Sequence, residues 1–209
     1  GKTTYFNLIS GQIGISAGRV KLKGQDVTRF NVSRRCKMGL GRAFQLTNLF
    51  PALSVLENVR LVMQSRMGKG FNLFTTAASH TEITEAAMAV LSRVRLDGLR
   101  DQKVSELSHG NQRKLEVAML IALDPDVYMF DEPTAGMSVD EAPVVLDLIA
   151  ELKQDRDRTI LLVEHKMDVI RSLADRIIVL HNGALVADGP PAEVMASDVV
   201  QEAYMGKEL

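Results

Sequence analysis

Two adjacent carboxylates, Asp131 and Glu132, follow an apolar run at residues 127–130. Such a run is typical of a buried strand in a parallel sheet, and open α/β sheets bind their ligands where the strands end. A first carboxylate at that place can hold Mg²⁺ on a nucleotide, and a second can orient or deprotonate a water molecule. The pair therefore indicates a nucleotide site with a positioned water.

A second candidate site lies at the start of the helix that we expect upstream of these carboxylates. Ser108, Gly110 and Asn111 open a segment with helical spacing of its apolar residues. Asp124-Pro125 ends that helix, because a residue before proline avoids the helical conformation. A helix start with a serine hydroxyl and a glycine is an anion site. Since a whole helix separates this site from the carboxylates, the two need not serve the same nucleotide.

The opening residues Gly1-Lys2-Thr3-Thr4 are similar to the end of a P-loop, G-x-x-x-x-G-K-[ST]. In such a loop Lys2 reaches the β- and γ-phosphates and Thr3 is a ligand of Mg²⁺. The motif is weak alone and strong beside the strand-end carboxylates. Because the first glycine of the loop and the preceding strand are not in this sequence, we interpret the chain as truncated within the loop at its N-terminus. We expect the chain by itself to bind ATP poorly.

Together these motifs resemble the nucleotide-binding domain of ABC transporters. Residues 107–111 resemble the signature loop of that family, usually LSGGQ, and residues 127–132 resemble its Walker B strand with the catalytic glutamate. His109 and Asn111 replace the commoner glycine and glutamine. Ser108 and Gly110 remain, so the anion site is expected to survive.

The resemblance gives roles to three further segments. Gln45, after an expected strand, matches the Q-loop glutamine, which touches Mg²⁺ and the attacking water and links the nucleotide to the membrane partner. His165, after another strand, matches the switch histidine, which contacts the γ-phosphate. Residues 135–138 match the D-loop of the dimer interface, with Ser138 where many members carry aspartate. Alone, such a glutamine is usually a surface residue and such a histidine a structural one.

The resemblance implies in-line hydrolysis of ATP, in which the protein mainly positions groups and neutralises charge. Lys2 and Mg²⁺ would offset phosphate charge, Glu132 would orient or deprotonate the water, and the signature residues would reach the ATP of a second copy. The expected catalytic residues are Gln45, Glu132 and His165. The expected ligands of Mg²⁺ are Thr3, Gln45 and Asp131. The expected contacts to ATP are Gly1, Lys2, Thr3, Thr4, Gln45, Ser108, Gly110, Asn111, Asp131 and His165.

The fold class implied is α/β, a P-loop NTPase of the ABC ATPase type. It has a RecA-like parallel sheet with helices, a helical subdomain and antiparallel β-hairpins. We expect one nucleotide-binding domain over residues 1–209, with the core in 1–52 and 107–209. The helical subdomain is expected in residues 53–106, where it would dock on transmembrane subunits.

Local patterns predict most elements. Capping boxes at Ser54-x-x-Glu57 and Ser79-x-x-Glu82 predict helices to about residues 67 and 94. Asp140 is expected to cap a later helix, and Asn182-Gly183 predicts a type I′ hairpin between 176–180 and 184–187. The remaining expectations are a helix carrying Phe6, a half-buried antiparallel strand at 19–23 ended by 24–26, a basic helix with a solvated face at 30–38, a strand at 39–44, a loop at 68–79, a fully buried strand at 159–164, and short helices after Pro190-Pro191.

Composition limits the class of protein. The 209 residues are 46% hydrophobic with a net charge of −1, which suits a sizeable core and gives no basic field for nucleic acid. The single cysteine, Cys36, excludes an intramolecular disulfide and a cysteine zinc cluster and fits a reducing compartment. The longest apolar run, 117–123, is far shorter than the ~20 residues of a membrane span, and no signal peptide opens the sequence. Membrane association is therefore expected through partners.

Finer features suggest the kind of transporter. His109 and the segments 112–116, 135–137 and 202–206 resemble the ATPase of branched-chain amino acid importers. Urea and short-amide importers are similar, and the lipopolysaccharide exporter ATPase is more distant. ABC ATPases of DNA repair or translation usually carry coiled-coil insertions or tandem domains, which this sequence lacks. An inactive interaction module is disfavoured by the complete set of catalytic residues.

The resemblance also implies partners and a location. We expect a second ABC ATPase subunit, identical or different, together with transmembrane permease subunits. A periplasmic substrate-binding protein is expected to act indirectly, and no nucleic acid is expected. The chain would lie at the cytoplasmic face of the inner membrane, and the partners would determine the substrate.

Overall fold

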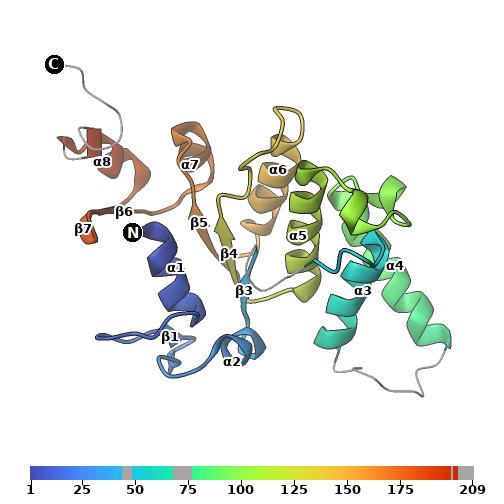
Figure 1. The fold of residues 1–209 in the computed structure, drawn as a ribbon. Coiled ribbons are helices and arrows are strands. Elements are labelled where there is room, and N and C mark those ends of the chain that lie inside the picture. Colours follow the sequence, from blue (N-terminus) through green and yellow to red (C-terminus); the bar gives the residue numbers. More distant parts are fainter. Residues whose placement is uncertain (44–48, 68–76, 199, 202–209) are drawn as a thin grey trace. The chain divides into compact units, whose positions relative to one another are not determined.

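The computed structural model describes residues 1–43, 49–67, 77–198 and 200–201. The chain forms two compact units. Figure 1 shows their helices and strands. The terminal unit comprises Gly1–Val32 and Val163–Leu209, and the central unit comprises Ser33–Leu162.

The central unit contains a three-stranded sheet of order β3-β4-β5 and the helices around it. β3 and β4 are parallel, with Leu40 opposite Val127 and Arg42 opposite Met129. Its elements are α2 (Val32–Lys37), β3 (Leu40–Arg42), α3 (Val55–Arg66), α4 (Ala77–Arg93), the 3₁₀ helices η1 (Asp97–Leu99) and η2 (Val104–Glu106), α5 (His109–Leu123), β4 (Val127–Asp131), α6 (Ala142–Leu152) and β5 (Thr159–Val163). The strand predicted before the two carboxylates is thus β4, and its middle three residues are buried as expected.

Helices α3, α4 and α5 pack on one another through buried apolar side chains. Val59 of α3, Leu91 of α4 and Leu115 of α5 are fully buried. The predicted cap of α3 is confirmed, because the Ser54 hydroxyl accepts a hydrogen bond from the Glu57 amide at 3.2 Å. The assignment of residues 53–106 to a separate helical subdomain stays a prediction.

Residues 50–55, which lead into α3, form hydrogen bonds with α3 and with the chain before α5. The buried Asn58 side chain accepts from the Phe50 amide at 2.8 Å and donates to the carbonyls of Phe50 and Ser54. The same segment bonds to the chain before α5, where the Val104 amide donates to Leu53 and the Ser105 amide donates to Pro51, both at 3.1 Å. Residues 50–55 and 102–105 therefore form one hydrogen-bonded layer.

The described part of the terminal unit includes a helix, two hairpins and two further short helices. Its elements are α1 (Lys2–Ser10), β1 (Lys21–Leu22), β2 (Gln25–Asp26), α7 (Met167–Leu173), β6 (Ile177–His181), β7 (Ala184–Gly189) and α8 (Pro191–Ala196). The predicted type I′ turn is confirmed, because Asn182 and Gly183 both have positive φ, at 49° and 80°. Val179, Val194 and Val200 form a small buried cluster that joins the hairpin to the C-terminal helix.

Two predicted helix starts are wrong. Ser79 does not cap α4, because that helix already includes Ala77, and alanine is the strongest helix former. Residues 77–79 of the predicted loop are therefore helical, and residues 68–76 lie outside the described part. Asp140 does not cap α6, since Glu141 occupies the N-cap position without a side-chain cap bond.

Three predictions of strand length and exposure also need correction. β1 covers only Lys21–Leu22 of the strand predicted at 19–23, the turn at residues 23–24 ends it, and Gln25 and Asp26 pair back on it as β2. β5 is not fully buried, because only Val163 is buried and β5 is the edge strand of the described sheet. In α2, Arg34 and Lys37 are exposed as expected, but Arg35 is buried, and burial lowers its pKa.

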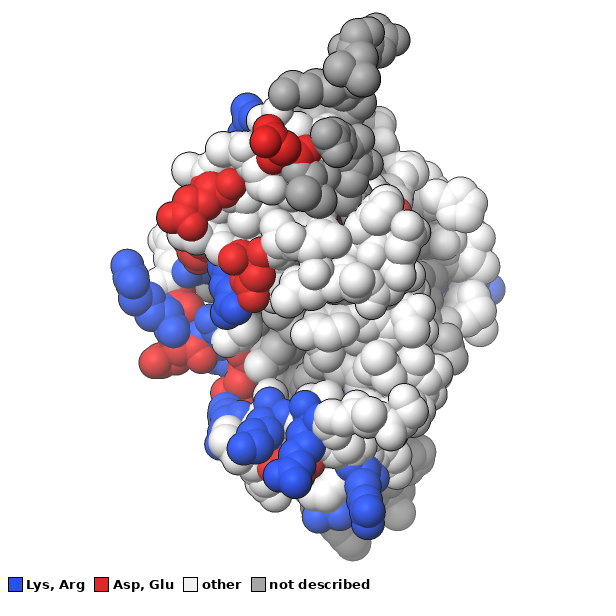
Figure 2. Space-filling view, turned by 90° about the vertical axis from the view of Figure 1, so that its left-hand side faces the viewer, with Lys and Arg blue, Asp and Glu red and all other residues white. Residues whose placement is uncertain are grey.

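The surface mixes charged and uncharged areas. Figure 2 shows one face on which a broad area carries no Lys, Arg, Asp or Glu, and basic side chains gather at one end. In the described residues, no helix is long and apolar enough to cross a bilayer.

Candidate functional site

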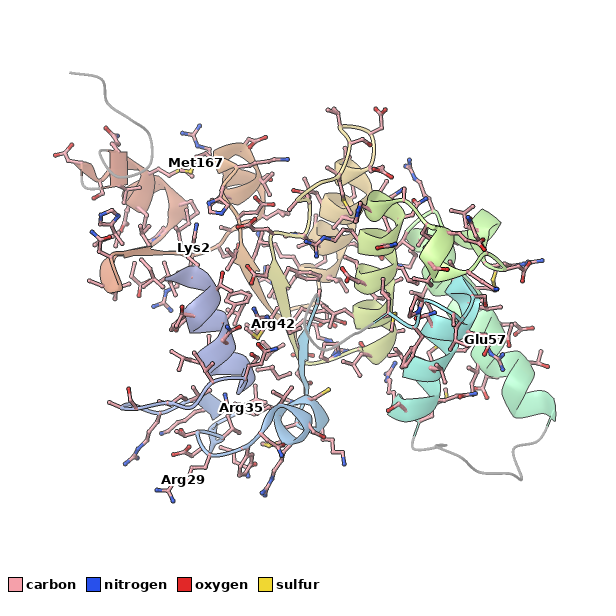
Figure 3. The ribbon with its side chains drawn as sticks, viewed as in Figure 1. Lys2, Arg29, Arg35, Arg42, Glu57 and Met167 are labelled. Atoms are coloured by element: carbon pink, nitrogen blue, oxygen red, sulfur yellow. The ribbon has the colours of Figure 1, made fainter. Side chains whose placement is uncertain are left out.

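The carboxylate of Asp131 lies at the C-terminal end of β4 and is bound by a buried arginine from the neighbouring strand. Arg42, labelled in Figure 3, is the last residue of β3. Its Nη2 donates to Asp131 Oδ2 at 3.0 Å. The Arg42 side chain is 0% exposed, whereas the Asp131 side chain is 16% exposed. Burial lowers the pKa of Arg42, and the adjacent carboxylate opposes that shift. The strand end is therefore a fixed ion pair with one face toward solvent.

Glu132 follows in an unusual backbone conformation. Its φ is 51°, in the left-handed region that residues other than glycine rarely adopt. The turn is closed by the Ala135 amide, which donates to the Glu132 carbonyl at 3.0 Å. Strained conformations of this kind occur often at functional sites, because the surrounding structure must hold them.

The start of α5 is organised by Ser108. This residue is the N-cap, and its hydroxyl accepts a hydrogen bond from the Asn111 amide at 3.2 Å. The Asn111 side chain in turn accepts from Lys114 Nζ at 3.2 Å. The predicted helix start at Ser108 is thus confirmed, and its hydroxyl stabilises the helix itself. The binding of an anion there stays a prediction.

An open hollow of about 240 Å³ adjoins the start of α5. Its lining combines α5 with the turn after β4, namely His109, Gln112, Arg113, Glu116, Ala135 and Gly136. Glu116 and Arg113 form an ion pair at 3.3 Å. Burial raises the pKa of Glu116, and Arg113 opposes the shift. His109 therefore contributes to this hollow between two of the predicted motifs.

In the terminal unit the opening lysine meets the predicted switch histidine. Gly1 is the N-cap of α1, and Lys2 is its first residue (Figure 3). Lys2 Nζ lies 2.9 Å from His165 Nδ1, although the two are 163 positions apart in the sequence. Because an ammonium group only donates, this contact is a hydrogen bond in the tautomer whose Nδ1 carries no proton. Glu164 fixes the backbone beside it, because its carboxylate accepts from the His165 amide at 2.9 Å.

Comparison with known proteins identifies the family. Residues 1–135 match the family model described as ABC transporter. This chain belongs to the ABC transporter family. In addition, residues 184–209 match the model described as branched-chain amino acid ATP-binding cassette transporter.

The ABC family includes close relatives over nearly the whole chain. The high-affinity branched-chain amino acid transport ATP-binding proteins BraF of Pseudomonas aeruginosa and LivG of Escherichia coli K12 are each 32% identical to it, over 99% of this chain and 83% of theirs. A nucleotide-free ATP-binding cassette from an ABC transporter superposes with a TM-score of 0.78 at 26% identity, covering 99% of this chain and 84% of that one. A dimeric cassette bound to ADP and Pi gives 0.77 at 25%, covering 91% and 81%.

The fold prediction is confirmed: the chain is an ABC ATPase of the α/β class with a parallel sheet and antiparallel hairpins. The individual residue roles stay predictions. Of the predicted ABC site residues, Lys2 and His165 are in contact, Asp131 and Glu132 share the end of β4, and Ser108, Gly110 and Asn111 share the first turn of α5. Gly1, Thr3 and Thr4 lie at the start of α1, and Gln45 lies outside the described residues.

Sequence reasoning missed Arg42, Lys114 and Glu141. A charged residue inside the apolar segment of β3 was a usable signal for Arg42, because a buried charge needs a partner. Ser138-x-x-Glu141 has the spacing of a capping box, which was a signal for Glu141.

Proposed function

We propose that this chain is the ATP-hydrolysing subunit of an ABC importer for branched-chain or related amino acids. The observation that carries the enzymatic part is the end of β4, where Asp131 is fixed by Arg42 and Glu132 follows in a constrained turn. The substrate class is supported by the names of the relatives and by the match of the C-terminal segment.

The donor atoms predicted for the metal ion have suitable chemistry. Mg²⁺ prefers hard oxygen ligands and usually takes one or two from the protein, which suits the Asp131 carboxylate and the Thr3 hydroxyl together with Gln45. Because Arg42 binds Oδ2, the carboxylate of Asp131 keeps its second oxygen for the ion. When bound, Mg²⁺ neutralises charge on the phosphates.

The side chains would then act by position and charge. Lys2 would bind phosphate oxygens, and its convergence with His165 supports a shared anionic ligand at that point. Glu132 would orient the attacking water or accept its proton. Gly1 and Thr4 would add contacts at the helix start. The amides and hydroxyl at Ser108, Gly110 and Asn111 would bind the ATP of a second subunit.

The partners and location follow from this role. We infer that the chain pairs with a second ABC ATPase subunit and with transmembrane permease subunits, on the cytoplasmic face of the inner membrane. A periplasmic substrate-binding protein would deliver the amino acid without touching this chain.

The test is to replace Glu132 with Gln in the full-length gene product. We expect ATP to bind and hydrolysis to fall at least about 100-fold, the usual effect of losing a general base. Glu151→Gln is the matched control, because Glu151 is an exposed glutamate of α6 that pairs only at the surface with Arg93. Hydrolysis by Glu132→Gln at a rate close to that of the control would refute the role.

Uptake of labelled leucine by cells carrying the same two variants tests the substrate. Loss of uptake in cells with Glu132→Gln, but not in cells with the control Glu151→Gln, supports branched-chain amino acid import. Unchanged uptake, with the variant expressed and no duplicate system, would refute that substrate and direct the search to urea, short amides or an exported lipid.

A further inference from the structure

The carboxylate of Glu141 contacts two segments that the sequence separates by a helix and a strand. Its Oε2 accepts from the amide of Ser138 at 3.2 Å and from the hydroxyl of Ser138 at 3.0 Å. Its Oε1 lies 3.5 Å from Lys114 Nζ on α5. Lys114 also donates to Asn111 in the first turn of the same helix. One carboxylate therefore joins the loop at residues 135–138 to the start of α5.

The missing side chain of Gly110 makes room for this carboxylate. A Cβ atom at Gly110 would lie 2.6 Å from both Cδ and Oε1 of Glu141. Gly110 is the second residue of α5, and glycine is the least favourable residue within a helix apart from proline. Alanine at this position would form a better helix, but its Cβ would collide with the Glu141 carboxylate. The contact with Glu141 thus explains why the position holds glycine.

Burial and charge both favour the contact. Lys114 is 8% exposed, and a buried ammonium group requires a partner of opposite charge. The Ser138 amide is the main cause that holds the pKa of Glu141 below its ordinary value, with burial opposing and Lys114 assisting. The carboxylate is therefore charged at neutral pH.

The identity of residue 138 also fits. The Ser138 hydroxyl donates to Glu141. An aspartate at this position could not donate, and its carboxylate would repel Glu141.

We propose that Glu141 is a positioning residue that ties the loop 135–138 to the first turn of α5, so that Ser138 and Gly110 move together. The consequence for turnover rests on the proposed function, because it assumes that both segments meet ATP. The contact itself does not depend on that function, and it is tested without nucleotide.

The first test is a double-mutant cycle of Gly110→Ala and Glu141→Ala, read as melting temperature in the full-length protein. With Glu141 present, Gly110→Ala displaces the carboxylate and lowers the melting temperature. In the Glu141→Ala background the displaced group is gone, so Gly110→Ala raises it through helix propensity. Equal shifts in both backgrounds would overturn the proposal.

The second test measures the loop directly. Val139 is 90% exposed beside Ser138, so a spin label on Val139→Cys, with Cys36 replaced by alanine, reports the motion of this loop by EPR. At temperatures well below the melting temperature, Glu141→Ala should narrow the central line of the EPR spectrum, because the loop moves more freely. Glu141→Gln should narrow this line less, and Glu151→Ala should leave its width unchanged. An unchanged line in Glu141→Ala would overturn the proposal. If the full-length protein showed coupling but no ATP hydrolysis, the proposed function alone would fail.

Discussion

The ion pair between Arg42 and Asp131 gives the sharpest prediction about stability, because its two members differ in exposure. Replacing Asp131 by Ala leaves a fully buried guanidinium without this carboxylate. Removing one partner of a buried ion pair typically costs about 3–5 kcal/mol, and the complete burial of Arg42 favours the upper half of that range. Replacing Arg42 by Met leaves Asp131, whose side chain is 16% exposed and can recruit water, so we expect about 2 kcal/mol.

Thermal unfolding without nucleotide measures both losses. For a chain of this length, 1 kcal/mol corresponds to about 2–4 °C in melting temperature. Asp131→Ala should therefore lower the midpoint by roughly 8–20 °C and Arg42→Met by roughly 4–8 °C. The double variant should be clearly more stable than the sum of the single losses predicts, because it removes both charges.

Two results would refute this reasoning. Losses that add within about 0.5 kcal/mol would show that the pair is not coupled. A larger loss for Arg42→Met than for Asp131→Ala would show that burial does not determine the asymmetry. Neither measurement uses ATP. A wrong prediction for the ion pair would therefore not affect the role proposed for Glu132.

Two smaller predictions concern α5 and β4. Ser108→Ala should lower the free energy of unfolding by about 1 kcal/mol, because the Asn111 amide loses its acceptor, whereas Ser105→Ala at an exposed position should change it by less than ~0.5 kcal/mol; equal stability of the two variants would contradict the cap. Burial, more than any other cause, raises the pKa of Tyr128 to about 12. The neutral phenol therefore stabilises the fold fully below its unfolded pKa of about 10 and loses this effect as the pH rises through 12. Tyr128→Phe should reduce the fall in the free energy of unfolding between pH 10 and 12, measured by denaturant titrations at a series of pH values. An equally steep fall in the variant would refute this prediction.

Local chemistry explains which elements could be predicted from the sequence. The cap at Ser54 and the turn at Asn182-Gly183 depend only on residues within four positions, so their patterns were sufficient. The prediction that Ser79 caps α4 was wrong for a reason that is also local. The helix already includes Ala77, so it begins before the residue that was expected to cap it. The exposure of β5 depends on its place at the edge of the described sheet, which no pattern within the strand encodes.

The candidate site was predictable where a motif carries it and not where distant segments meet. The carboxylates at the end of β4 and the start of α5 were found from residue type and spacing. The contact of Lys2 with His165 and the partners Arg42 and Lys114 are long-range, so they needed the fold. Glu141 lay between these cases, because its spacing from Ser138 was visible and its reach to α5 was not.

The hydrogen-bonded layer of residues 50–55 and 102–105 has a mechanical consequence. Residue 50 follows shortly after Gln45, and residue 105 is three positions before Ser108. Asn58 holds Phe50 to α3, and the carbonyls of Pro51 and Leu53 accept from the amides of Ser105 and Val104. Residues 50–55 are therefore bonded both to α3 and to the segment before α5. A displacement of Phe50 would therefore move α3 and the segment that leads to Ser108 together, because hydrogen bonds join all three.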